Sequence, residues 1–215
     1  MGQYAIQVLA YYGYRNIMTS ASPKHHETMR SLGASAVFNY RAPTVVGDIL
    51  DAARRPVGAE PSIPLILDCI GSLKGSVEPI AKLAQSGSRV AVLLPVIVRD
   101  STEDMTPEYA MDVQVAAPWA GGVDAVGVRT HFYLKVSHCY LDVPVGIPNA
   151  KQNEFFRQYL QSSIMPTMLA EGIIKPNPRR VVEGSTLLDR AQKSIDMLRR
   201  KEASGERLVW RVADT

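Results

Sequence analysis

The sequence has few of the residues that build disulfide frameworks and metal clusters. Its 215 residues include only two cysteines, Cys69 and Cys139, which lie far apart along the chain. Two cysteines cannot form a disulfide framework or a four-cysteine zinc site. We therefore expect a protein of a reducing compartment, in the cytoplasm.

Excess charge and long apolar runs are absent as well. The net charge is +3 and charged residues make up 21% of the chain, which is too little to argue for a nucleic acid partner. No apolar run approaches the roughly 18 to 20 residues that a membrane span needs, and the first residues lack the order of a signal peptide. We expect a soluble protein that binds neither nucleic acid nor membrane.

What the chain does contain is a hydrophobic content of 46%, ample for a buried core, and a regular alternation of helix and strand patterns. We expect helices over 1–12, 23–32, 45–54, 74–84, 152–171 and 186–200. We expect strands over 16–20, 36–40, 64–70, 89–94, 128–134 and 208–212. Continuous apolar runs such as Leu65-Ile66-Leu67 are typical of parallel strands covered on both faces. The prediction is an α/β protein with a Rossmann-like, doubly wound parallel sheet.

Two regions interrupt this alternation. Residues 95–125 are expected to form a loop with one short helical segment, and 144–148 a connection. Pro166 is expected to bend the long helix around it. We place the Rossmann-like domain at 1–150 and a C-terminal unit of helices and a strand at 151–215.

The first candidate for chemistry is Gly2, which precedes the first helix. In dinucleotide-binding folds a glycine-rich turn lets backbone amides approach the pyrophosphate at a helix N-terminus. One glycine at the start of a helix also fits an ordinary helix start, so both interpretations stand on this residue alone.

Further blocks follow in a fixed order. They are GQYAIQ (2–7), TSASPK (19–24), SLGA (31–34), VFNY (37–40), DCIG (68–71), GSRV (87–90) and SGERLV (204–209). This series resembles the cofactor half of the medium-chain dehydrogenase/reductase superfamily. The ASPK stretch and the SGERLV ending resemble most the zinc-free fungal branch of trans-acting enoyl reductases from polyketide pathways.

The resemblance implies what lies outside the sequence. The family's first strand, most of its glycine-rich turn and its N-terminal GroES-like domain would precede Met1. We therefore expect a doubly wound sheet lacking its first, central strand. By resemblance, residues 181–183 and the strand 208–212 normally return to complete the GroES-like domain. The chain alone is expected to be poorly stable and inactive as a reductase.

The end of the second strand of the family's fold indicates the choice of cofactor. NAD-selective sites usually place Asp or Glu there for the adenosine ribose, whereas this chain has Ser20 and Ser22, with Lys24 next. Hydroxyl donors and a cation suit a 2′-phosphate, and the resemblance adds Tyr40. We therefore expect NADPH. The alternative is that Ser22 caps a helix and Lys24 is an ordinary solvated residue.

On the nicotinamide side, the resemblance implies cofactor contacts at the ends of two further strands. The residues concerned are Cys69, Ile70 and Gly71 on one strand, and Leu93, Leu94 and Pro95 on the next. Cys69 is expected to be a small packing residue rather than a nucleophile, because no histidine lies next to it in the sequence. No catalytic residue is assigned.

Two groups of histidines were considered as metal ligands. His25 and His26, with Glu27, point to different faces of one helix, and His131 and His138, with Cys139, lack a ligand spacing. We expect no zinc.

The segment 175–215 holds ten Lys or Arg against six Asp or Glu. This excess fits either a helix C-terminus or a docking face for an acidic carrier protein.

By resemblance, the function is that of an NADPH-dependent oxidoreductase, an enoyl reductase that reduces an α,β-unsaturated thioester, either small or carrier-bound, with a polyketide synthase as partner. Two alternatives remain open from the sequence. One is a non-catalytic remnant or interaction module, and the other is a relative of zinc-type alcohol dehydrogenases or quinone reductases.

Overall fold

The computed structural model describes residues 1–54, 60–102, 104–128 and 154–213. Its helices are α1 (Gly2–Tyr11), α2 (His26–Ser31), α3 (Val45–Ala53), α4 (Glu78–Leu83), α5 (Val113–Ala116), α6 (Glu154–Tyr159), α7 (Met165–Ala170) and α8 (Leu187–Arg199). A 3₁₀ turn, η1 (Pro23–His25), precedes α2, and two π-helical turns, η2 (Leu73–Val77) and η3 (Leu160–Ile164), precede α4 and α7. The expected helices are present, several of them divided by such turns.

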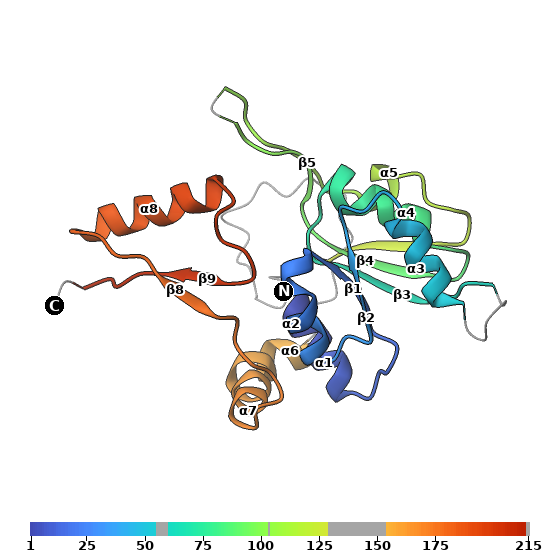
Figure 1. Cartoon of the computed structure of the whole chain (residues 1–215), viewed down its shortest axis with the longest axis horizontal. Coiled ribbons are helices and arrows are strands. Elements are labelled where there is room, and N and C mark those ends of the chain that lie inside the picture. Colours follow the sequence, from blue (N-terminus) through green and yellow to red (C-terminus); the bar gives the residue numbers. More distant parts are fainter. Residues whose placement is uncertain (55–59, 103, 129–153, 214–215) are drawn as a thin grey trace.

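The strands follow the expected order with shifts at their ends. They are β1 (Met18–Ala21), β2 (Ala36–Asn39), β3 (Leu65–Asp68), β4 (Arg89–Leu93), β5 (Val96–Arg99), β6 (Glu108–Ala110), β7 (Asp124–Val128), β8 (Arg179–Val181) and β9 (Arg207–Val209). Together with the helices they make the α/β architecture that the sequence predicts (Figure 1).

The parallel sheet is divided in two. β1 and β2 form a two-stranded parallel sheet, and β3, β4 and β7 form a three-stranded parallel sheet in that order. Within the described residues, β1 pairs only with β2 and β3 only with β4. This is the arrangement expected of a doubly wound sheet that lacks its first strand, because that strand would lie between β1 and β3.

Each half-sheet has a hydrophobic core of its own. The smaller core combines Ile6 of α1 with Ile17, Met29, Ala34 and Val37 around β1, α2 and β2.

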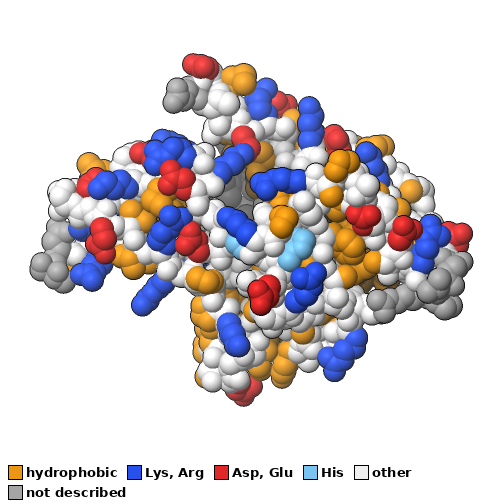
Figure 2. All heavy atoms as spheres, viewed as in Figure 1, with side chains coloured by type: hydrophobic (Ala, Val, Ile, Leu, Met, Phe, Trp, Pro, Cys, Tyr) orange, Lys and Arg blue, Asp and Glu red, His pale blue; other side chains and the backbone are white. Residues whose placement is uncertain are grey.

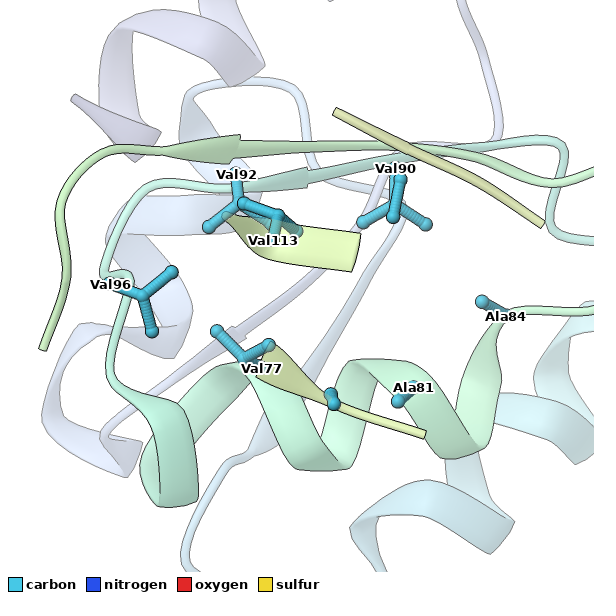
Figure 3. Packing of buried hydrophobic residues seen from close by; sticks show 9 residues of the cluster. Val77, Ala81, Ala84, Val90, Val92, Val96 and Val113 are labelled. Atoms are coloured by element: carbon cyan, nitrogen blue, oxygen red, sulfur yellow. The ribbon is translucent and has the colours of Figure 1, made fainter. Parts of the chain in front are cut away.

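The larger core lies under β3, β4 and β7. Figure 3 shows Val92 of β4 beside Val113 of α5, with Val90 further along the strand and Val77, the last residue of η2, on the helical segment opposite. The two cores are separate clusters of buried residues, so the two half-sheets are packed largely independently of each other.

The sequence expectation that the strands are covered on both faces is wrong for β3. Leu65 is 57% exposed and Leu67 is 47% exposed, although both belong to the apolar run that predicted a buried strand. Among the described strands, β3 has a partner on one edge only, and these two side chains lack the cover that a fully enclosed parallel strand receives. Exposed apolar strand edges of this kind favour association.

The region 95–125 contains more structure than expected. The predicted short helix is present as α5, but β5 and β6 form an antiparallel hairpin where a loop was expected. The strand expected over 128–134 begins earlier than predicted, because β7 spans Asp124–Val128; residues 129–134 lie outside the described ones. The expected connection over 144–148 and the boundary between residues 150 and 151 also lie outside them.

The C-terminal part consists of the α6–η3–α7 segment and a unit of β8, α8 and β9, which projects to the left in Figure 1. Pro166 stands at the start of α7, directly after a π-helical turn, so the helix is interrupted where the sequence predicts a bend. β8 pairs in parallel with β9. Among the described helices, none combines the length and the apolar character that crossing a membrane requires.

Long-range hydrogen bonds of Gln3, Tyr4 and Gln7 join helix α1 to this C-terminal part. Gln7 accepts a 2.7 Å hydrogen bond from the backbone nitrogen of Lys175, and the hydroxyl of Tyr4 accepts one of 3.2 Å from Asn177. Gln3 donates to the backbone oxygen of Gly205 at 3.3 Å. These contacts oppose fraying of the first turn of α1, where Gly2 lies.

Candidate functional site

The candidate site has two regions, one at the carboxyl end of each half-sheet. The first follows β3 and β4 and contains the residues expected near the nicotinamide. The second follows β1 and β2 and contains those expected near the 2′-phosphate. Ligands of open α/β folds bind beyond the carboxyl ends of the strands, so both regions have a suitable place in the fold.

The turn after β3 is organised by Asp68, which sequence reasoning did not single out. Its side chain is buried, and one carboxylate oxygen accepts hydrogen bonds from the backbone nitrogens of Ile70, at 2.8 Å, and Gly71, at 3.2 Å. The other oxygen accepts a 2.7 Å bond from the hydroxyl of Ser76. Two backbone amides and a hydroxyl compensate the burial of this carboxylate and fix the turn.

Gly71 brings the ends of β3 and β4 together. Its φ angle is +67°, and a Cβ atom there would lie 2.8 Å from the backbone oxygen of Leu93 and 3.1 Å from that of Pro95. The backbone nitrogen of Ile97 donates a 2.6 Å hydrogen bond to the Gly71 oxygen. The structure thus places the Cys69–Gly71 turn directly against residues 93–95, the two segments that the resemblance implies for one subsite.

The exposed side chain in this region is Ile70, of which 69% is accessible. Cys69 is partly buried, and burial raises the pKa of its thiol. A raised pKa disfavours the thiolate, which is the reactive form of cysteine. This agrees with a packing role for Cys69 rather than a nucleophilic one.

Leu94 lies at the boundary with the next strand. Its backbone nitrogen donates a 3.0 Å hydrogen bond to the oxygen of Val128, and a Cβ atom at Gly127 would lie 2.6 Å from one of its methyl groups. Leu94 is therefore positioned by β7.

The second region gathers polar and cationic side chains at the ends of β1 and β2. Ser20, Lys24 and Tyr40 are exposed, and Ser22 is half-buried. Ser22 precedes the 3₁₀ turn η1 but makes no side-chain capping hydrogen bond, so the capping role that the sequence allowed is not seen. Among the described residues, Lys24 forms no ion pair. These hydroxyl and ammonium groups remain available to an anion.

The histidines that follow Lys24 bond to different partners. Nε2 of His25 lies 2.9 Å from the hydroxyl of Ser204, and Nε2 of His26 lies 3.1 Å from the backbone oxygen of Ala21. Figure 2 shows the described histidine side chains near the middle of the view, with Lys and Arg side chains around them.

The described residues contain no group of three His, Cys, Asp or Glu side chains that could hold a metal ion. His131, His138 and Cys139 lie outside those residues, so the absence of zinc stays a prediction.

The surroundings of Gly2 leave room for a side chain, unlike those of a glycine in a tight turn. It begins α1, and a Cβ atom there would have no neighbour within 4 Å. Packing therefore does not require a glycine at this position, and a role in approaching a ligand stays a prediction.

Several basic side chains of the C-terminal segment pair with acidic side chains of the same segment. Lys193 pairs with Asp189, Arg199 with Asp196, and Arg200 with Glu202. On the face shown in Figure 2, Lys and Arg alternate with Asp and Glu over this part of the chain. The pairing leaves the excess of basic residues in this segment unchanged, so the docking interpretation stays a prediction.

The chain is similar in sequence to several known proteins. No protein-family model matches it. It is 25% identical over 210 residues to trans-enoyl reductase mpsG of Macrophomina phaseolina, a match that covers 98% of this chain and 51% of that protein. It is 26% identical over 207 residues to the enoyl reductase component lovC of lovastatin nonaketide synthase from Aspergillus terreus, covering 96% of this chain and 49% of that one. The chain spans about half the length of the curated relatives it matches.

The fold of the chain is also similar to that of solved reductase structures. The CurK enoyl reductase matches with a TM-score of 0.54 at 13% identity, over 98% of this chain and 51% of its own. The quinone oxidoreductase from Coxiella burnetii matches with a TM-score of 0.57 at 18% identity, over 99% of this chain and 49% of its own. The resemblance to fungal trans-enoyl reductases of the medium-chain dehydrogenase/reductase superfamily is thus confirmed, as is the Rossmann-like fold.

Proposed function

We propose that this chain carries the nucleotide-binding unit of an NADPH-dependent enoyl reductase that acts on an α,β-unsaturated thioester in polyketide biosynthesis. The observation that carries the proposal is a similarity to trans-enoyl reductases over almost the whole chain. The two candidate regions lie at the carboxyl ends of the half-sheets, where a dinucleotide would run from the 2′-phosphate side to the nicotinamide side.

The donor set suits NADPH better than NADH. β1 ends in Ser20-Ala21-Ser22 and is followed by Lys24, with no carboxylate in this stretch to accept hydrogen bonds from a ribose. Ser22 makes no capping bond, and Lys24 is exposed. These groups would hold the 2′-phosphate, together with Tyr40 at the end of β2.

On the nicotinamide side, the chain would supply position rather than chemistry. The Asp68 carboxylate holds the Cys69–Gly71 turn, and the contact of Gly71 with Leu93 holds that turn against the end of β4. The apolar side chain of Ile70 would provide a wall for the nicotinamide ring. When bound, the cofactor supplies the hydride that reduces the β-carbon of the unsaturated thioester.

The substrate and partner follow from the names of the relatives. One relative is the enoyl reductase component of a nonaketide synthase, so the proposed substrate is an enoyl thioester held on a carrier, and the proposed partner is a polyketide synthase. A small thioester such as a crotonyl thioester is the corresponding model substrate.

Titration of the chain with NADPH and NADH tests the proposal. A charge-assisted phosphate contact is worth roughly 1.5 to 3 kcal/mol, so we expect NADPH to bind about one to two decades more tightly. Lys24→Ala should reduce the difference between the affinities for NADPH and NADH. Lys82→Ala removes an equally exposed charge in the last turn of α4 and should leave it unchanged. Equal affinities of the wild type for both cofactors would refute the assignment.

A further inference from the structure

We propose that Arg41 is a second cation of the 2′-phosphate subsite and, with Lys24, determines the preference for the phosphorylated cofactor. This inference rests on the proposed function.

The register of the smaller sheet brings the two cations to one edge. β1 and β2 are parallel, and their last paired residues are Ala21 and Asn39. Neighbouring strands lie about 4.8 Å apart, so Ser22 and Tyr40, the next residue on each strand, leave the sheet next to each other. Lys24 follows the first of these residues by two positions, and Arg41 follows the second directly.

Arg41 is held in place by its own neighbours. Its backbone nitrogen donates a 3.1 Å hydrogen bond to the side-chain oxygen of Asn39, the last residue of β2. Its guanidinium carbon lies 4.8 Å from the centre of the Tyr40 ring. Stacking on an aromatic face restricts the guanidinium without consuming its hydrogen-bond donors, which stay free for a ligand.

The charge of Arg41 is also uncompensated. The side chain is exposed, and among the described residues no carboxylate forms an ion pair with it. The arginines Arg54 and Arg99, in contrast, pair with Asp51 and Glu108. The register places this guanidinium at the same edge of the sheet as an exposed lysine and two serines. Together these groups suit a dianionic phosphate, because the planar fork of arginine matches phosphate oxygens in pairs.

The same stack gives Tyr40 a second role. Its expected place against the phosphate rests only on the family resemblance. Its contact with Arg41 makes it a positioning residue for the guanidinium, a role that requires the ring but not the hydroxyl.

The test uses two small probes, 2′,5′-ADP and 5′-AMP, which differ in the 2′-phosphate. Their affinities for the wild-type chain and for Arg41→Ala are measured by isothermal titration at low salt. We expect Arg41→Ala to weaken 2′,5′-ADP about five- to tenfold and to leave 5′-AMP within about twofold. Tyr40→Leu should weaken 2′,5′-ADP more than Tyr40→Phe does, because Phe keeps the ring on which Arg41 stacks.

Arg15→Ala is the matched control. Arg15 is exposed and also lacks an ion pair among the described residues, but it precedes β1 and so lies at the opposite end of that strand from Ser22. The Arg15→Ala variant should bind both probes with the affinities of the wild type. Circular dichroism confirms that each variant is folded, and Arg41→Gln serves as a second variant that keeps a long polar side chain.

The outcomes separate this inference from the proposed function. If the wild type binds 2′,5′-ADP no better than 5′-AMP, the NADPH assignment itself fails. If the wild type prefers 2′,5′-ADP and Arg41→Ala keeps that preference, Arg41 has no part in the subsite and only this inference fails. An equal loss of affinity for both probes in Arg41→Ala would also overturn this inference, because Arg41 would then contact a part that the probes share and not the 2′-phosphate.

Discussion

The hydroxyl of Ser76 donates a 2.7 Å hydrogen bond to the carboxylate of Asp68 and so joins the turn after β3 to the helical segment that follows it. The other oxygen of that carboxylate accepts from two backbone amides of the same turn. One buried side chain therefore determines the shape of the segment that we place beside the nicotinamide.

Replacement of Asp68 should be costly. Asp68→Ala leaves two backbone amides and a hydroxyl without their acceptor, and we expect the free energy of unfolding to fall by about 2 to 4 kcal/mol. Ser76→Ala removes one neutral donor and should cost about 1 kcal/mol. Urea denaturation measures both values. Asp51→Ala, which removes an exposed carboxylate paired with Arg54, is the control and should change stability by less than about 0.5 kcal/mol. A similar small effect at Asp68 would show that the network does not hold the turn.

Gly71 should tolerate no side chain. Gly71 and Gly87 both have positive φ angles, +67° and +88°, but only at Gly71 would a Cβ atom meet the backbone, 2.8 Å from the Leu93 oxygen. We expect Gly87→Ala to destabilise by about 1 kcal/mol and Gly71→Ala by about 2 to 4 kcal/mol. Thermal unfolding compares the two. Equal losses would mean that the contact between the ends of β3 and β4 is looser than described.

Cys69 should react slowly with thiol reagents. Burial raises the pKa of its thiol, so at pH 8 a smaller fraction is thiolate than in an unperturbed cysteine. Labelling with a chromogenic disulfide measures this in a Cys139→Ser background. We expect labelling slower than that of a free thiol at pH 8 and faster when urea unfolds the chain. Labelling faster than a free thiol would indicate an activated cysteine and would contradict the packing role.

The divided sheet predicts that residues 1–215 alone do not turn over substrate. β1 and β3 do not pair within the described residues, and each half-sheet has a separate core. The two regions of the site are therefore not fixed relative to each other by a continuous hydrogen-bonded ladder, and precise orientation contributes much of catalysis. NADPH oxidation with a crotonyl thioester should stay at the background rate. Measurable turnover by a cooperatively unfolding monomer would show that the division of the sheet matters little.

Much of the fold could be predicted from local patterns. The helices were found because their apolar periodicity is long enough to be distinctive, as in α8, where Thr186 also caps the N-terminus by accepting from the nitrogen of Asp189. The β5–β6 hairpin was missed because its strands are short and an acidic loop separates them. The start of β7 was predicted too late because Gly127 interrupts its apolar run. A Cβ atom at Gly127 would lie 2.6 Å from a methyl group of Leu94.

The candidate site was predictable in part. The blocks quoted from the sequence place the Cys69–Gly71 turn and residues 93–95 together, and the structure brings them into contact. The roles of Asp68 and Arg41 could not be read from the sequence, because both depend on which atoms face them after folding. The buried carboxylate of Asp68 is recognised by the amides around it, and the cation at Arg41 by the ring on which it stacks.

The measurement that tests this account most directly is hydrogen–deuterium exchange of the chain with and without NADPH. Our account predicts slower exchange at the carboxyl ends of both half-sheets, in residues 20–26 and 39–42 on one side and 69–72 and 93–97 on the other. NADH should protect the second pair of segments but protect the first pair less. Protection confined to the β8–α8–β9 unit, or none at all with saturating NADPH, would contradict a nicotinamide dinucleotide site formed by these strand ends.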